Sequence, residues 1–348
     1  MRKILSFNLT RVTTSLIVFL TALMVLDTGR AVSSEQSVIE GAKKEGKLVV
    51  YTSMNVVNMN TMLEAFKKKY PFMKTEVYRS KSQLILNKLV QETRVRKYIA
   101  DAFSLTFPIW NELIGKGLVG KYDSPERKAY PKGMKDQDNN WTVLYLQVQG
   151  MAYNTDHVPA DVAPQNYEDL MHPRWKGKKI AMDYREQTWF AVMLEILGEE
   201  KGLDFMRRLA EQDLYLRENK TLLTQLLAAR EFPILVNTYI DTAAKIKGDG
   251  AHIEWRPGSN PIPASTHLVG LYSHSQRPNA AKLFVDYMLS AEGQNILAKT
   301  SGKFPARPGA KSDLTPLIKG YELHPVNPFV MSKYKEITKW FAEIFWKR

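Results

Sequence analysis

The sequence contains no cysteine among its 348 residues. This absence excludes disulfide bonds, thiolate metal sites, cysteine nucleophiles and a lipidated N-terminal cysteine. Long hydrophobic runs are scarce as well. The main one, Val12 to Leu26, spans 15 residues, fewer than the ~20 that a transmembrane helix needs. Acidic residues are outnumbered, with 36 Asp and Glu against 49 Lys and Arg, so the formal net charge is +13. A chain this basic is expected to attract anions or acidic surfaces.

The N-terminal segment has the layout of a secretory signal peptide. Arg2, Lys3 and Arg11 precede the apolar run. Gly29-Arg30-Ala31 then supplies small residues at the −3 and −1 positions of a cleavage site. A short membrane anchor is the alternative. Cleavage near Ala31 would remove four basic residues and one acidic residue, leaving 317 residues with a formal charge of +10. We therefore predict an exported, periplasmic protein, and export argues against a nucleic-acid partner.

Buried-type strands alternate with amphipathic helices through the first part of the predicted mature chain. Strands are expected at 47–51, 75–78 and 100–105, and apolar residues recur with helical spacing over 57–70 and 85–93. Short links between these elements predict a parallel α/β sheet. The chain is long enough for two lobes, because single hydrophobic cores stop growing near ~250–300 residues.

The second part of the chain returns to strands at 142–148 and 150–154. A linker rich in proline and glycine then runs from Pro257 to Pro263, before another strand at 267–272. Helices are expected at 187–197, 199–211 and 221–229. We predict that lobe one comprises 38–148 and 266–307, that lobe two comprises 150–265, and that the tail 308–348 carries an amphipathic helix.

Common catalytic motifs are absent from the sequence. Gly115 to Gly120 matches G-x-G-x-x-G, but it follows a predicted helix, which favours a helix end and return loop over a dinucleotide site. No G-x-S-x-G, Walker or H-E-x-x-H motif occurs, and the six histidines show no metal-ligand spacing. An exported hydrolase whose catalytic residues are distant in sequence stays an alternative, as does a purely structural periplasmic protein.

Polar turns follow several of the predicted strands, where ligands bind in open α/β sheets. Helix N-termini meet there too, and their free N–H groups favour anions. Each turn alone is equally consistent with helix capping, but their shared position favours a binding role. The candidate ligand-binding residues are Thr52, Ser53, Asn55, Arg79, Ser80, Thr106, Asp183, Tyr184, Arg185, Asn237, Tyr239 and His267.

Several segments together resemble extracellular solute-binding proteins of ABC transporters, nearest to the ferric-ion-binding branch. The most specific run is Tyr167-Glu168-Asp169-Leu170 followed by Pro173-Arg174-Trp175-Lys176-Gly177-Lys178. Similar segments cover about 41–307, and they are residues 46–53, 100–103, 151–155, 278–284 and 289–294.

The resemblance implies a type 2 periplasmic-binding-protein fold. Its two α/β lobes are joined by crossing hinge strands and close on a small ligand. It also implies a transport role without catalytic residues or a resident cofactor, with the loaded protein docking on an ABC permease in the inner membrane. We expect a monomer.

The metal ligands of the ferric branch carry over poorly. That branch typically places a histidine in the turn after the first strand, where this chain has Thr52-Ser53-Met54-Asn55. It also places two adjacent tyrosines where this chain has Tyr239 and Ile240. Ferric iron is a hard cation that wants several anionic oxygens, so Tyr239 is a metal ligand only if the solute is iron. We favour a small organic anion held by Arg79 and Arg185, with ferric iron as the alternative solute.

Overall fold

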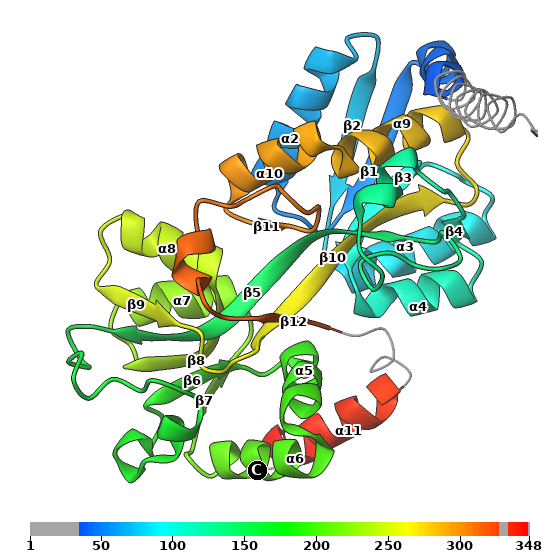
Figure 1. The fold of residues 1–348 in the computed structure, drawn as a ribbon. Coiled ribbons are helices and arrows are strands. Elements are labelled where there is room, and N and C mark those ends of the chain that lie inside the picture. The colour runs from blue at the N-terminus through cyan, green and yellow to red at the C-terminus, as the bar shows by residue number, and fades with distance from the viewer. Residues whose placement is uncertain (1–34, 327–332, 347–348) are drawn as a thin grey trace, which may run out of the picture.

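The computed structural model of the chain describes residues 35–326 and 333–346, so the predicted signal peptide lies outside the described residues. Two α/β lobes are joined by two long strands, β5 (Thr142–Asn154) and β10 (Ile262–Tyr272), which cross from one lobe to the other (Figure 1). The strand order through the joined sheet is β2-β1-β3-β10-β5-β8-β6-β7. The two-lobed α/β fold that the sequence predicts is therefore observed.

Lobe one is built on the parallel strands β1 (Lys47–Thr52), β2 (Lys74–Arg79) and β3 (Ala102–Thr106). Every residue of β1 after Lys47 is buried, as expected for a parallel strand that helices cover on both faces. The helix over 35–45 precedes β1. The other elements of this lobe are α2 (Val56–Lys69), α3 (Ser82–Arg94), α4 (Pro108–Gly115), β4 (Val119–Gly120), α9 (Pro278–Leu289), α10 (Ala291–Ser301) and β11 (Phe304–Pro305).

Lobe two contains β6 (Ile180–Asp183), β7 (Tyr215–Arg217) and β8 (Ile234–Tyr239), with β6 parallel to both β7 and β8. Its other elements are α5 (Gln187–Leu197), α6 (Glu199–Ala210), α7 (Lys220–Ala228), α8 (Ile240–Gly248) and β9 (Ile253–Arg256). Strand β12 (Leu323–Pro325) pairs with β10, and helix α11 (Tyr334–Phe345) follows. Short 3₁₀ helices lie at Pro125–Ala129, Glu168–Met171, Pro173–Trp175 and Thr315–Ile318.

Strand β5 is one continuous strand, whereas the sequence predicted two, at 142–148 and 150–154. Up to Val148 it pairs with β10, and from Gln149 onward it pairs with β8 and β9. Gly150 interrupts the hydrophobic pattern because the chain is crowded there. A Cβ atom on Gly150 would lie 2.2 Å from the Arg256 carbonyl oxygen and 2.6 Å from the Trp255 ring. The lobe boundaries given above stay a prediction.

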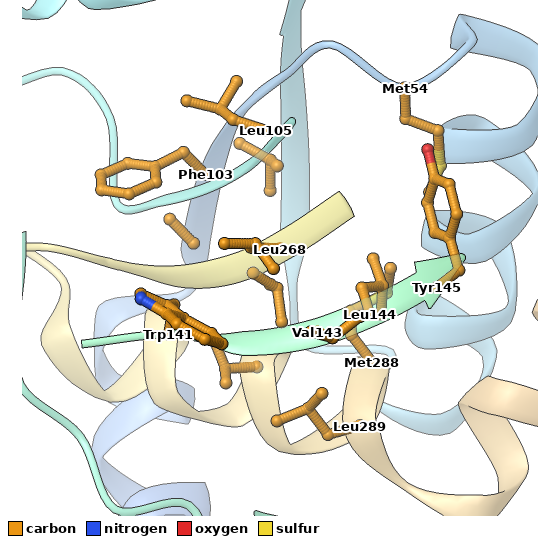
Figure 2. Close-up of a cluster of buried hydrophobic side chains, with 14 of the residues drawn as sticks. Met54, Phe103, Leu105, Trp141, Val143, Leu144, Tyr145, Leu268, Met288 and Leu289 are labelled. Carbon is orange, nitrogen blue, oxygen red and sulfur yellow. The ribbon is translucent and has the colours of Figure 1, made fainter. Parts of the chain in front are cut away.

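Separate hydrophobic cores stabilise the two lobes. In lobe one, Leu268 of β10 packs with Val143 and Leu144 of β5 and with Met288 and Leu289 of α9 (Figure 2). All five side chains are buried, and burying each stabilises the fold by roughly 1.5–3 kcal/mol.

The tail helix α11 completes the core of lobe two. The Phe341 and Phe345 rings lie 5.5 and 6.4 Å from the Phe190 ring of α5, between centroids. The Trp346 indole N–H donates to the Tyr184 carbonyl oxygen at 3.0 Å. The amphipathic tail helix predicted from the sequence is present, and it contacts the turn that precedes α5.

Candidate functional site

One face of the crossing strands carries polar side chains from lobe one to lobe two. In the strand register, His267 of β10 lies opposite both Thr106 of β3 and Tyr145 of β5, and Gln149 of β5 lies opposite Tyr239 of β8. Paired residues project to the same face, and every second residue along a strand does so too. The polar residues that share this face are Thr106, Tyr145, Gln147, Gln149, Tyr239, Ser265 and His267.

A buried lysine lies at the lobe-two end of this face. Lys220, the first residue of α7, places its ammonium group 2.7 Å from Glu186 Oε2 and donates to Gln149 Oε1 at 2.8 Å. The same ammonium lies 4.1 Å from the centroid of the Tyr239 ring. Only 4% of the Lys220 side chain and 12% of the Glu186 side chain are exposed, so this ion pair is largely shielded from water. The Gln149 amide also donates to Ser265 Oγ, which links the pair to β10.

The pKa values of both members of the buried Glu186–Lys220 pair are shifted. Burial raises the pKa of Glu186 to about 7, with the Asp183 carboxylate adding to the rise and Lys220 opposing it. Burial lowers the pKa of Lys220, and Glu186 opposes that shift. Both changes follow from the cost of keeping a charge away from water. Glu186 therefore changes its charge near neutral pH.

A second lysine approaches Tyr239 from lobe one. Lys303, just before β11, forms an ion pair with Asp241 of α8, so this contact joins the two lobes. Its ammonium lies 5.6 Å from the Tyr239 ring centroid and 5.9 Å from that of Tyr145. Tyr239 is thus flanked by two ammonium groups, one from each lobe. Burial raises the pKa of Tyr239 well above its usual value, so the phenol stays protonated.

Several buried polar groups near the junction have no hydrogen-bond partner. Both amide atoms of Asn237 are in this state, and His267 has only the Ser104 backbone close to its ring. The His267 ring stacks on Tyr145 at 4.6 Å, and burial lowers the pKa of His267 to about 3, so the imidazole is neutral. Because buried polar groups almost always have partners, these atoms mark a place where a polar ligand or water would be stabilised.

Three hydroxyl groups meet at the lobe-one end of the face. Ser82 Oγ lies 2.9 Å from both Ser53 Oγ and Thr106 Oγ1. These residues come from the end of β1, the first turn of α3 and the end of β3. Ser53 and Thr106 were predicted from the sequence, and Ser82 was missed. The sequence feature that could have identified Ser82 is its position in the polar turn after β2.

Other predicted residues have local structural roles. Thr52 Oγ1 donates to the Ser104 carbonyl oxygen at 3.0 Å, which links β1 to β3. Asn55 accepts from the Val57 backbone N–H at 2.9 Å and caps α2. The Asp183 carboxylate accepts two backbone N–H bonds at 2.9 Å, from the turns that follow β6 and β7. These contacts are turn and capping interactions of the kind that Thr, Asn and Asp commonly make.

A single carboxylate gathers further polar side chains at the lobe junction. Glu218, between β7 and α7, lies 2.5 Å from the Lys81 ammonium of lobe one and 3.1 Å from the Arg185 guanidinium. The Tyr184 hydroxyl donates to the same carboxylate at 3.3 Å. The Lys81 hydrogen bond is the main cause of a lowered Glu218 pKa. Two other predicted residues lie at the end of β2, the exposed Arg79 and the partly buried Ser80.

The two positions at which the ferric branch typically has ligands are occupied here by Asn55, in the turn after β1, and by Ile240. Asn55 is exposed and caps α2, whereas Ile240 is apolar and 0% exposed, and Met54, beside Asn55 in the turn after β1, is likewise buried at 2%. Met54 and Ile240 belong to the same hydrophobic cluster, which Ile240 joins from α8 of lobe two, and Met54 lies near Tyr145 (Figure 2). Within residues 35–326 and 333–346, no group of three or more His, Asp or Glu side chains is arranged to hold a metal ion. The carboxylates nearest Tyr239, Glu186 and Asp241, are paired with Lys220 and Lys303, so a metal ion would have to displace those ammonium groups to reach them.

Solved structures with the same fold are periplasmic binding proteins. Iron-bound HitA from Pseudomonas aeruginosa is 17% identical, with a TM-score of 0.73 over 86% of this chain and 99% of that one. AfuA from Actinobacillus pleuropneumoniae with fructose-6-phosphate bound is 23% identical, with a TM-score of 0.70 over 87% and 99%. The ferric binding protein from Campylobacter jejuni is 20% identical, with a TM-score of 0.72 over 85% and 99%. The fold is thus that of a two-lobed periplasmic binding protein.

Sequence comparison assigns the family. Residues 108–327 match the profile of the bacterial extracellular solute-binding proteins. The chain is also 26% identical over 270 residues to an uncharacterized protein from Haemophilus influenzae, across 74% of this chain and 77% of that protein. This chain belongs to the bacterial extracellular solute-binding proteins, so the predicted family resemblance is confirmed. Among the residues that the structure describes, no helix has both the length and the apolar character to cross a membrane.

Proposed function

We propose that this solute-binding protein captures a small organic anion at the junction of its two lobes and delivers it to an ABC permease. The observation that carries the proposal is the Tyr239 ring, which has the Lys220 ammonium at 4.1 Å and the Lys303 ammonium at 5.6 Å. The protein acts in the periplasm as a monomer and releases its solute unchanged.

The two ammonium groups of the junction offer an anion a counter-charge from each lobe, once their carboxylate partners Glu186 and Asp241 are displaced. Lys220 and Lys303 come from different lobes, so an anion between them would contact both lobes and stabilise the closed form. Charges in a partly dehydrated site interact more strongly than charges in water. The Asn237 amide, which has no partner, and the neutral His267 ring can hydrogen-bond the rest of such a solute.

The relatives of known structure are divided between two solute classes. AfuA holds fructose-6-phosphate, an organic anion, and HitA holds iron. Ferric iron would need anionic oxygen ligands, yet burial keeps the Tyr239 phenol protonated. The neighbouring carboxylates Glu186 and Asp241 are already paired with Lys220 and Lys303. We therefore favour an organic anion, with a phosphate-bearing metabolite as the first class to test.

Isothermal titration calorimetry with fructose 6-phosphate, inorganic phosphate, citrate and ferric citrate tests the proposal. We expect at least one iron-free anion to bind, and we expect Lys220→Met and Lys303→Met each to weaken it at least tenfold. Lys245→Met is the control, because Lys245 pairs with Asp249 on the exposed face of α8.

Two outcomes would contradict the proposal. One is an iron-dependent visible absorption band that Tyr239→Phe abolishes, together with no response to any iron-free anion. The other is turnover of an added phosphate ester that Lys220→Met abolishes, which would support the exported hydrolase instead.

A further inference from the structure

We infer that Glu186 sets the solute specificity of the junction: its carboxylate occupies the position on Lys220 that the anionic group of the solute takes, so the solute binds by displacing it. This inference rests on the proposed capture of an anion. Glu186 acts here as an internal competitor, which favours solutes with strong negative charge over weak monoanions.

The coordination of the Lys220 ammonium leads to this inference. An ammonium group has three N–H donors. One is directed to Glu186 Oε2 at 2.7 Å and one to Gln149 Oε1 at 2.8 Å, and the Tyr239 ring lies 4.1 Å away. With these three neighbours in place, an incoming anion finds no free donor. Gln149 is fixed on the hinge strand by its bond to Ser265, so the carboxylate is the neighbour that can leave.

The Glu186 side chain does not cap the helix that it precedes. It occupies the N-cap position of α5, yet its side chain makes no capping hydrogen bond. Its side chain is 12% exposed, so it is not sealed inside the core. Release of Lys220 therefore breaks the ion pair without opening the first turn of α5.

The groups around Glu186 make its charged form costly. Among the residues that the structure describes, Lys220 on α7 is the cation that stabilises the charged form of Glu186, whereas the carboxylate of Asp183 on β6 disfavours it. Tyr239 at the end of β8 and Tyr334 on α11 also face Glu186 within electrostatic range. The Asp241 carboxylate on α8 is within electrostatic range of both Tyr239 and Lys220.

These surroundings raise the pKa of Glu186 to about 7. A solute on Lys220 removes the counter-charge of Glu186 and raises that pKa further, so binding an anion is coupled to proton uptake. Affinity for an anion of constant charge is then flat below pH 7. Above pH 7 it falls with rising pH, by up to tenfold per unit.

The test uses inorganic sulfate and glucose 6-sulfate, because phosphate groups titrate near pH 6 themselves. Calorimetry from pH 6 to 8.5 compares the wild type with Glu186→Gln. We expect wild-type affinity to fall about tenfold between pH 7.5 and 8.5. We expect Glu186→Gln to bind at pH 8.5 as tightly as the wild type binds at pH 6, with no pH dependence. The control is Glu254→Gln, which removes a carboxylate from the exposed Lys247–Glu254 ion pair of the same lobe. Its affinity and pH dependence should match those of the wild type.

A purely structural role for Glu186 predicts a different pattern. Loss of the carboxylate would then lower the melting temperature of Glu186→Gln without tightening anion binding at any pH. If Glu186→Gln fails to fold, Glu186→Asp serves instead. Its shorter side chain weakens the contact with Lys220, so affinity should rise several-fold at pH 8 while the pH dependence remains.

The outcomes separate this inference from the proposed function. If no variant and no wild-type sample binds sulfate, glucose 6-sulfate, phosphate, fructose 6-phosphate or citrate at any pH, the proposed anion capture fails. If the wild type binds with constant affinity from pH 6 to 8.5, anion capture stands and the role of Glu186 is overturned. A pH dependence that persists unchanged in Glu186→Gln overturns it too, since it would belong to Lys220.

Discussion

Replacing Gly150 with alanine tests the packing at the point where β5 passes from one lobe to the other. The new Cβ atom would lie 2.2 Å from the Arg256 carbonyl oxygen and 2.6 Å from the Trp255 ring. Contacts that short do not occur between real atoms, so β9 must move away from β5 by about 1 Å. Overpacking of this kind costs roughly 1–3 kcal/mol. In a chain of this size, that lowers the melting temperature by roughly 2–6 °C.

The matched control for this variant is Gly248→Ala. Gly248 is the last residue of α8, and a Cβ atom there would meet nothing within 4 Å. Because alanine restricts the unfolded chain more than glycine does, this variant should be stabilised by about 0.4–1 kcal/mol. Differential scanning calorimetry of both variants checks the pair. A Gly150→Ala protein that melts with the wild type, or above it, would refute the crowding described at the β5–β9 crossing.

Three further changes test other parts of the structure. Phe341→Ala leaves a cavity in the lobe-two core, so the free energy of unfolding measured in urea should fall by about 3–5 kcal/mol. An unchanged urea midpoint would mean that α11 is not packed there. Burial raises the pKa of Asp286 to about 6, so its ionisation destabilises the fold progressively as pH rises from about 4 to 6. The melting temperature of Asp286→Asn should therefore rise relative to that of the wild type over that range. The amide oxygen of the new side chain can still accept the hydrogen bond from the Tyr122 hydroxyl. A difference in melting temperature that stays constant with pH would contradict the raised pKa of Asp286. Lys81→Ala removes an exposed contact to Glu218, so stability should change by less than about 1 kcal/mol. Small-angle scattering should give solute-free Lys81→Ala a larger radius of gyration than the wild type, because the contact joins the two lobes. An equal radius of gyration would mean that this contact does not hold the lobes together.

Much of the fold follows from local sequence patterns. The helix predicted at 187–197 is α5 with the same bounds, and its eleven residues contain no glycine or proline to interrupt it. The four short strands β4, β7, β11 and β12 were not predicted. Each has only two or three residues, so its existence depends on a partner strand that is distant in the sequence. Gly150 likewise resembles a break between strands until β9 is placed against it.

The central charges of the site were harder to predict. Lys220 and Lys303 resemble ordinary surface lysines in the sequence. Glu186 lies in a polar turn from which only Asp183, Tyr184 and Arg185 were predicted to bind the ligand. Their burial depends on ion pairs that span 34 and 62 positions, Glu186 with Lys220 and Asp241 with Lys303. No local pattern encodes such pairs. The turns themselves were a useful signal, since Ser53 and Thr106 do meet in one hydroxyl cluster.

The most direct test of anion capture is mass spectrometry of what copurifies with the protein from the periplasm, covering both organic molecules and iron. The proposal predicts a small organic anion in near-stoichiometric amount with the wild type, reduced at least tenfold in Lys220→Met and retained in Lys245→Met. Stoichiometric iron, or a neutral or cationic molecule that Lys220→Met retains in full, would contradict it.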